Sequence, residues 1–166
     1  MHVVIPVLWT VVATLVAGAA QRQDDPVILE AHWEAAQPLV PPKNVYLQLH
    51  ASGQVGLADD TTRQVTSSYL KRRTRLSADE IESLDRLLNE PGVRELRSWY
   101  EGSDGFVDYR VSLTVTISRG DRDQVIVIVS PTSKSLRSGE DFPDHLRRLL
   151  ERLESLVDGN PFKSRR

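Results

Sequence analysis

The chain has 166 residues, no cysteine, and 21 basic against 23 acidic residues, for a formal net charge of −2. The absence of cysteine excludes thiolate metal sites and cysteine nucleophile chemistry. A near-neutral chain lacks the basic excess of a dedicated nucleic-acid binder, so we expect no nucleic-acid partner.

The chain begins with an uncharged apolar stretch, 3–20, which ends in the small residues Ala17-Gly18-Ala19-Ala20 and is followed at once by polar residues. This layout predicts a secretory signal peptide over 1–20, cleaved after Ala19 or Ala20, and thus a periplasmic or secreted protein. The alternatives are an inner-membrane anchor over 3–20, the only membrane contact we expect, and a buried helix of the domain. Without a cysteine, a lipoprotein anchor is excluded.

After the leader, about 145 residues remain, enough for one domain with its own core. Residues 21–44 contain four prolines and predict an extended lead-in, in which 28–36 could form a short helix. The domain itself is expected over 45–159, and 160–166 form a basic tail.

Alternating apolar residues predict a strand over 45–51, and Ser52-Gly53 predicts a turn into a return strand that begins near Val55. Residues 62–75 are rich in β-branched side chains and predict a further strand. Ser77 and Glu80 form a capping-box pattern, so a helix is expected from there to Pro91-Gly92.

A second helical stretch is expected over 93–100. Strict alternation over 107–117 then predicts the clearest strand, with Leu113 and Val115 on the buried side and Thr114 and Thr116 on the other. An interior strand over 125–129 and an amphipathic helix from Pro143 to about Val157 complete the pattern.

These elements predict an α+β fold, a two-layer sandwich in ββαββα order. Two helices would cover one face of an antiparallel sheet of four to five strands.

The stretch Val45 to Val157 resembles a family of small exported bacterial domains of unknown function. The resemblance rests on Tyr46-x-Leu-x-Leu followed by Gly53, on Leu76-Ser77-x-x-Glu80-Ile81, on the passage from Tyr100 to Asp108, and on Pro143-x-x-Leu146-x-x-Leu149. These motifs concern the fold, so the resemblance implies no catalytic or ligand-binding residue.

No catalytic motif, metal site or cofactor fingerprint is present, so we expect no cofactor and no metal. His50 is interpreted as an exposed residue. The acidic residues Asp141 and Asp144 beside His145 are interpreted as helix-start residues favoured by the helix dipole, not as metal ligands, and Glu101, Asp104 and Asp108 as turn chemistry rather than calcium ligands. The sequence therefore favours a non-enzymatic binding domain that contacts a protein or an envelope component through the polar side of its sheet. The residues of this predicted binding face are Tyr46, Gln48, His50, Asp108 and Arg110.

Two further hypotheses stay open. A periplasmic or secreted hydrolase could use Asp108 and His50 if the sheet brought them within reach of one substrate atom. The basic run Lys71, Arg72, Arg73 and Arg75 could contact a polyanion, or it could protect a strand edge against unwanted pairing.

Overall fold

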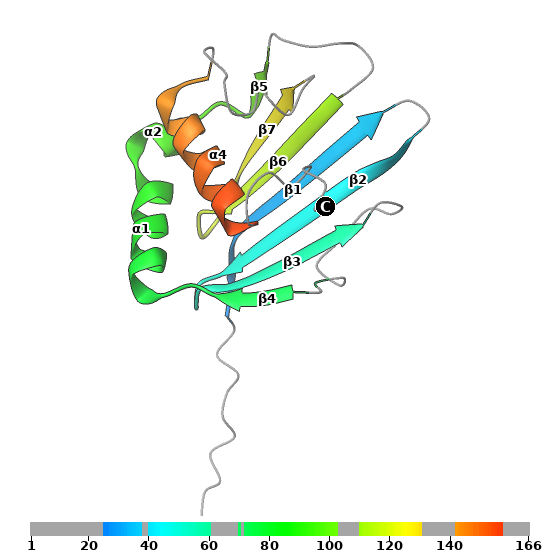
Figure 1. The fold of residues 1–166 in the computed structure, drawn as a ribbon. Helices are drawn as coiled ribbons and strands as arrows, with labels where there is room; N and C mark the ends of the chain where they lie inside the picture. The colour runs from blue at the N-terminus through cyan, green and yellow to red at the C-terminus, as the bar shows by residue number, and fades with distance from the viewer. Residues whose placement is uncertain are drawn as a thin grey trace, which may run out of the picture.

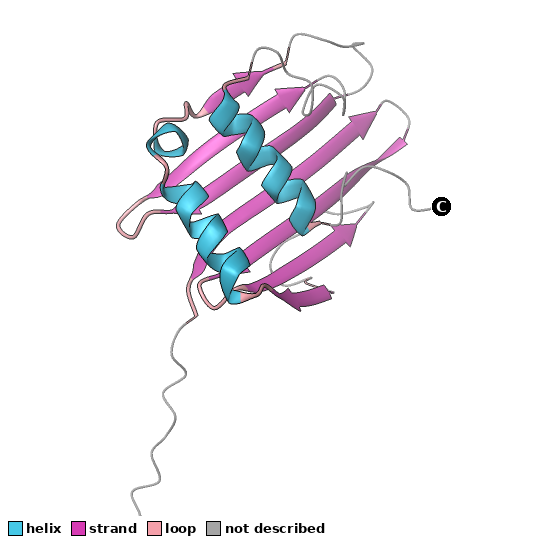
Figure 2. Cartoon of the chain, turned by 60° about the vertical axis from the view of Figure 1, so that its left-hand side comes forward, coloured by secondary structure: helices cyan, strands magenta, loops and turns pink. Residues whose placement is uncertain are grey.

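The computed structural model describes residues 25–37, 40–60, 70, 72–102, 110–130 and 142–157. In these residues the chain forms a two-layer α+β structure, in which the helices lie on one face of a single sheet (Figures 1 and 2). The predicted leader and the basic tail lie outside the described residues.

The sheet has seven strands in the order β4-β3-β2-β1-β6-β7-β5 within the described part of the chain. The strands are β1 (Val27–Gln37), β2 (Val40–His50), β3 (Gln54–Asp60), β4 (Arg72–Arg75), β5 (Trp99–Glu101), β6 (Arg110–Ser118) and β7 (Asp123–Ser130). The helices are α1 (Ala78–Asn89), α2 (Pro91–Arg94) and α4 (Asp144–Leu156). The predicted four to five strands and two helices are therefore too few, although the fold class is correct.

The largest difference from the sequence analysis is β1. It lies in the middle of the sheet, between β2 and β6, and pairs antiparallel with both. The predicted helix over 28–36 is wrong because the alternate residues Leu29, Ala31, Trp33 and Ala35 all enter the core, with Trp33 only 1% exposed. Cross-strand packing on both sides thus overrides the weak helical spacing in this segment.

The strands β2 and β3 form the predicted hairpin. Its turn depends on Gly53, whose φ of +80° lies in the left-handed region that favours glycine. The backbone N–H of Gly53 donates to the carbonyl of His50 at 2.9 Å, and its own carbonyl accepts from Leu76 at 3.0 Å. Gly53 therefore joins the hairpin to the segment that leads into α1.

Of the strand predicted over 62–75, the structure describes only its end as a strand, β4, which pairs antiparallel with β3 and forms one edge of the sheet. Residues 61–69 and Lys71 lie outside the described residues.

The predicted capping box of α1 is confirmed. The Ser77 hydroxyl accepts from the Glu80 N–H at 3.3 Å, and the Glu80 carboxylate accepts from the Ser77 N–H at 2.9 Å. Leu84, Leu87 and Leu88 place the apolar side of α1 against the sheet. Together these features fix both the start and the orientation of the helix.

The helical stretch predicted over 93–100 is mostly wrong. The chain forms the single turn α2 and then enters the sheet as β5, which runs parallel to β7 and makes the sheet mixed. A strand of three residues, with only Tyr100 buried, is too short to give a readable period. Tyr100 packs edge-on against Phe142, with the ring centroids 6.0 Å apart.

The helix α4 presents Leu146, Leu149 and Leu153 to the core, each 0% exposed. The strand β6 presents Leu113 and Val115, also 0% exposed, whereas Thr114 and Thr116 are partly exposed on the other face. The predicted division of β6 into an apolar and a polar side is confirmed, and the main core lies between the sheet and the helices.

Candidate functional site

Among the described residues, no helix lies on the second face of the sheet, which we call the uncovered face (Figure 2). At the middle of this uncovered face four polar side chains meet on β1 and β2, because Glu30 pairs with Gln48 and His32 pairs with Tyr46. Paired residues on adjacent antiparallel strands project from the same face, so these four side chains form one cluster.

Glu30 organises this cluster. The Tyr46 hydroxyl donates to Oε1 of Glu30 at 2.5 Å, and Nε2 of Gln48 donates to the same oxygen at 3.1 Å. Burial and the bond to Glu30 raise the pKa of Tyr46 well above the usual value for a tyrosine. Tyr46 is therefore a neutral hydrogen-bond donor in a structural network and no base at neutral pH.

Tyr46 and Gln48 are buried, each only 8% exposed, although the sequence analysis places both on an exposed binding face. The reason is that Leu70 packs over this part of the sheet, against Tyr46 and Ala58. Gly56 makes this approach feasible, since a Cβ at that position would lie 2.7 Å from Cδ1 of Leu70. These two predicted contact residues thus stabilise the fold instead of meeting a partner.

His32, which lies beside Tyr46 with its ring edge-on at 6.5 Å, was given no role by the sequence. Its Nε2 is buried and has no hydrogen-bond partner among the described residues. The neighbouring Glu30 accepts from Tyr46 and Gln48 through Oε1, and Nε2 of His32 makes no hydrogen bond to it. The described residues hold no group of three or more histidine, cysteine or acidic side chains that could bind a metal ion.

His50 has a structural partner at the start of β1. Its Nδ1 lies 2.8 Å from the carbonyl oxygen of Asp25, and the carboxylate of Asp25 accepts from the N–H and the hydroxyl of Ser52 at 2.8 and 2.5 Å. The two bonds from Ser52 lower the pKa of Asp25. Asp25, His50 and Ser52, which we call the N-terminal clasp, fasten the start of β1 to the β2–β3 turn.

The remaining residues of the predicted binding face are not brought together by the described structure. Arg110 begins β6, where its backbone lies opposite Ala36, and its side chain is outside the description. Asp108 lies outside the described residues, so the pairing of Asp108 with His50 required by the hydrolase hypothesis is untested.

The basic run ends in the edge strand β4. Arg73 and Arg75 are exposed there, opposite Gly56 and Gln54 of β3. Long cations at an edge strand impede pairing with another chain. Their place therefore fits the edge-protection hypothesis, while contact with a polyanion remains an untested alternative.

The sequence analysis missed the most exposed apolar part of the uncovered face. Trp99 is 49% exposed and Val125 is 43% exposed. Trp99 on β5 pairs with Val127 on β7, which alternates with Val125 on the same face. Thr114 and Thr116 of β6 lie opposite these two valines. We call these five residues the apolar patch.

The sequence contains the residues of this patch, but their pattern favours other structures. Val125 lies in a segment that is apolar on both sides, and this pattern predicts an interior strand. In the structure Ile126 and Ile128 are buried against the helices, while the alternate valines face the uncovered side. Trp99 was assigned to a helix, so its place next to β7 could not be inferred.

The comparisons with known proteins give no identification. No protein-family model matches the chain, and no curated protein is significantly similar to it. The resemblance to small exported bacterial domains therefore stays a prediction. Among the described residues, none of the helices is long and apolar enough to cross a membrane.

Proposed function

We propose that the chain is an exported, non-enzymatic binding domain that contacts a protein or an envelope component through the apolar patch. The exposure of both Trp99 and Val125 on the uncovered face, with Val127 paired to Trp99 and two positions from Val125, carries this proposal. They are the exposed large hydrophobic residues among the described side chains, and both lie on this one face. Clustered exposed apolar residues mark interaction surfaces more often than isolated ones do.

The chemistry of the patch supports a protein contact. Tryptophan is among the residues that contribute most to protein interfaces, because a large ring is buried at the cost of few rotatable bonds. The surrounding valines and threonines are β-branched and are held on paired strands, so little side-chain freedom is lost on binding. We therefore propose that the binding surface lies at the β5–β7 end of the sheet and not at Tyr46 and Gln48.

Export is supported by the apolar stretch over 3–20 and its small-residue end. Asp25, the first described residue, lies five positions after Ala20 and is already held by Ser52. Cleavage after Ala19 or Ala20 would therefore leave the N-terminal clasp intact. The hydrolase alternative gains no support from His50, whose ring contacts the backbone of Asp25.

The test is site-specific photo-crosslinking in the producing cell. A photoreactive amino acid at position 125 is expected to give one discrete adduct, and the Trp99→Ser variant is expected to lose it. The same amino acid at Asp79, exposed on α1, is the matched control and should give none. Adducts of equal yield from both positions, or an adduct at 125 that survives Trp99→Ser, would refute the patch as the contact surface.

Export is checked on the same cells. The N-terminus of the mature protein, determined by mass spectrometry, should be Ala20 or Gln21. A protein that retains residues 3–20 and sediments with the membranes would support the anchor instead.

A further inference from the structure

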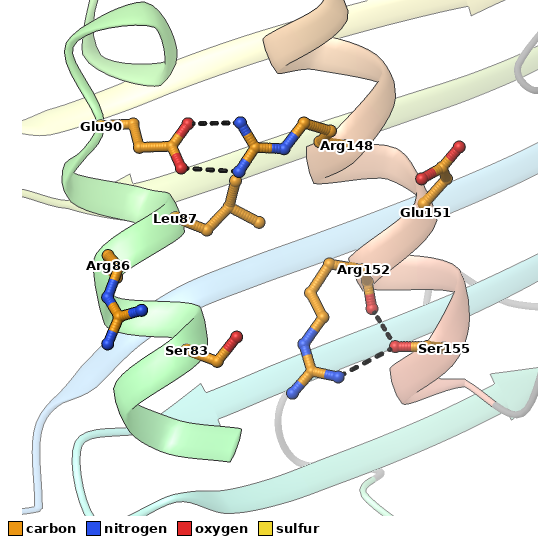
Figure 3. Close-up of a pocket in the computed structure, with 8 residues that line it drawn as sticks. All are labelled: Ser83, Arg86, Leu87, Glu90, Arg148, Glu151, Arg152 and Ser155. Atoms are coloured by element: carbon orange, nitrogen blue, oxygen red, sulfur yellow. Dashed lines mark hydrogen bonds and ion pairs between the residues drawn. The ribbon is translucent and has the colours of Figure 1, made fainter. Parts of the chain in front are cut away.

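A second surface feature lies on the opposite side of the molecule, between α1 and α4 (Figure 3). The two helices lie next to each other on the sheet and leave an open groove of about 440 Å³ on their outer side. The groove is lined by Ser83, Arg86, Leu87 and Glu90 from the α1 side and by Arg148, Glu151, Arg152 and Ser155 from α4. Its volume lies in the range of small-molecule sites, but its lining is polar, which suits a hydrophilic ligand.

At one end of the groove, the charges of Glu90 and Arg148 neutralise each other. The two terminal nitrogens of Arg148 donate to the two carboxylate oxygens of Glu90 at 2.7 and 2.6 Å. This bidentate pair lowers the pKa of Glu90 and raises that of Arg148, so both groups stay charged. It bridges α1 and α4 and leaves no net charge for a ligand at this end.

The other end is different because Arg152 has no carboxylate partner among the described residues. Its two terminal nitrogens make only long contacts, 3.4 Å each, to the hydroxyl of Ser155 and to the carbonyl of Glu80. Its Nε is buried and has no hydrogen-bond partner. A guanidinium has five donors, and an oxyanion satisfies two of them at once through a side-on contact.

The carboxylate of Glu80 attracts Arg152 electrostatically but forms no direct ion pair with it among the described residues. The carboxylate of Glu80 is held by the N–H and the hydroxyl of Ser77 at 2.9 and 2.8 Å, and these bonds lower its pKa. Arg152 therefore faces the groove with most of its hydrogen-bonding capacity unused.

The hydroxyl of Ser83 is a further donor near the guanidinium of Arg152, whereas the hydroxyl of Ser155 already donates to the backbone carbonyl of Arg152 at 2.7 Å. Figure 3 shows the guanidinium between the two helices, with the hydroxyl of Ser83 pointing toward it from α1 and Ser155 beside it on α4. Arg86 lines the same groove and, among the described residues, forms an exposed ion pair with Glu82 at 2.8 Å, which is weak enough to exchange for a ligand. The guanidinium of Arg152 and the hydroxyl of Ser83 thus face one position between the helices, and Arg86 lines the same groove from α1.

We propose that this end of the groove binds the phosphate group of a phosphorylated sugar, with Arg152 as the main anchor. The phosphate oxygens would accept from Arg152, Arg86 and the hydroxyl of Ser83. The sugar hydroxyls would meet the exposed carboxylate of Glu151 and the hydroxyl of Ser155 along the groove. This site is independent of the apolar patch, since it lies on the helical layer and not on the uncovered face.

The proposal is tested by NMR titration of the purified protein with glucose 6-phosphate, inorganic phosphate and glucose. The terminal Nη–H signals of Arg152 should move downfield with glucose 6-phosphate, because donors that make only long contacts of 3.4 Å gain a closer acceptor. Affinity should be several-fold higher for the sugar phosphate than for inorganic phosphate, and glucose alone should give no change. Equal affinity for the two phosphates, or the same shifts with glucose alone, would overturn the proposal.

Matched variants separate binding from folding. Arg152→Gln should weaken binding about tenfold or more, which corresponds to the loss of one charge-assisted contact. Arg147→Gln on the same helix is the control, since Arg147 pairs with Asp144 outside the groove, and it should bind as the parent does. If Arg152→Gln does not fold, Arg86→Gln, an exposed position, should weaken binding about two- to fivefold. Unchanged affinity in both groove variants would refute the assignment.

Discussion

The turn at Gly53 gives the sharpest test of how the hairpin is attached to α1. Gly53 and Gly120 both have a positive φ, +80° and +85°. A Cβ at Gly53 would lie 2.3 Å from Cδ1 and 2.7 Å from Cγ1 of Ile81, whereas a Cβ at Gly120 would meet nothing within 4 Å. Substitution by alanine therefore strains the backbone at both sites and causes a steric clash at only one.

The expected magnitudes follow from these two terms. The left-handed conformation costs a non-glycine residue about 1–2 kcal/mol, so Gly120→Ala should lower the free energy of unfolding by about that amount. Overpacking adds about 1–3 kcal/mol, which gives a loss of about 2–5 kcal/mol for Gly53→Ala. The stiffening of the unfolded chain by alanine is the same in both variants and cancels in their difference.

The assay is urea unfolding of the parent and the two variants, with the free energy taken from the midpoint and the slope of the transition. The double variant Gly53→Ala/Ile81→Ala completes the experiment. Relative to Ile81→Ala alone, the double variant should lose only as much free energy of unfolding as Gly120→Ala loses relative to the parent, because the clashing atoms of Ile81 are gone. A Gly53→Ala variant no less stable than Gly120→Ala would refute the close approach of Ile81.

Two pH-dependent predictions follow from the altered pKa values. The pKa of Asp25 is lowered by its bonds from Ser52, so its stabilising contribution is present above the unfolded-state pKa near 4 and is lost as the pH falls through the folded-state value. Asp25→Asn should therefore make the melting temperature depend less on pH on the acid side. An unchanged acid profile would contradict a formed N-terminal clasp. The pKa of Tyr46 is raised by burial and by Glu30, so stability is retained up to about pH 10, where an unfolded tyrosine ionises, and decreases above it. Tyr46→Phe should remove this alkaline loss and one late-titrating phenol from the ultraviolet titration. A Tyr46 that ionises near pH 10, the ordinary value for tyrosine, would show that the cluster with Glu30 does not form.

The sequence was sufficient wherever a long period and a local hydrogen-bond pattern agree. The division of β6 into buried Leu113 and exposed Thr114 needs only strict alternation over nine residues. The start of α1 needs only Ser77 and Glu80, three positions apart, because the capping box is formed within a single turn. The apolar stripe of α4 is likewise a local property of its heptad-like spacing.

Tertiary structure decided what depends on distant partners. Residues 27–37 become a central strand only because β2 and β6 lie on either side, which no property of the segment itself reveals. Tyr46 is buried because Leu70, 24 positions along the chain, packs over it. Trp99 and Val125 form one patch only because β5 adds in parallel to β7.

The candidate sites therefore differ in how far they could be foreseen. The alternation of β2 correctly placed Tyr46 and Gln48 on the side of the sheet away from the helices, but burial on that side depends on what else folds over it. The groove with Arg152 joins side chains of two helices about seventy residues apart, from Glu80 to Arg152. Secondary structure is determined largely by neighbours in sequence, whereas exposure and the meeting of charges depend on contacts that only the folded chain creates.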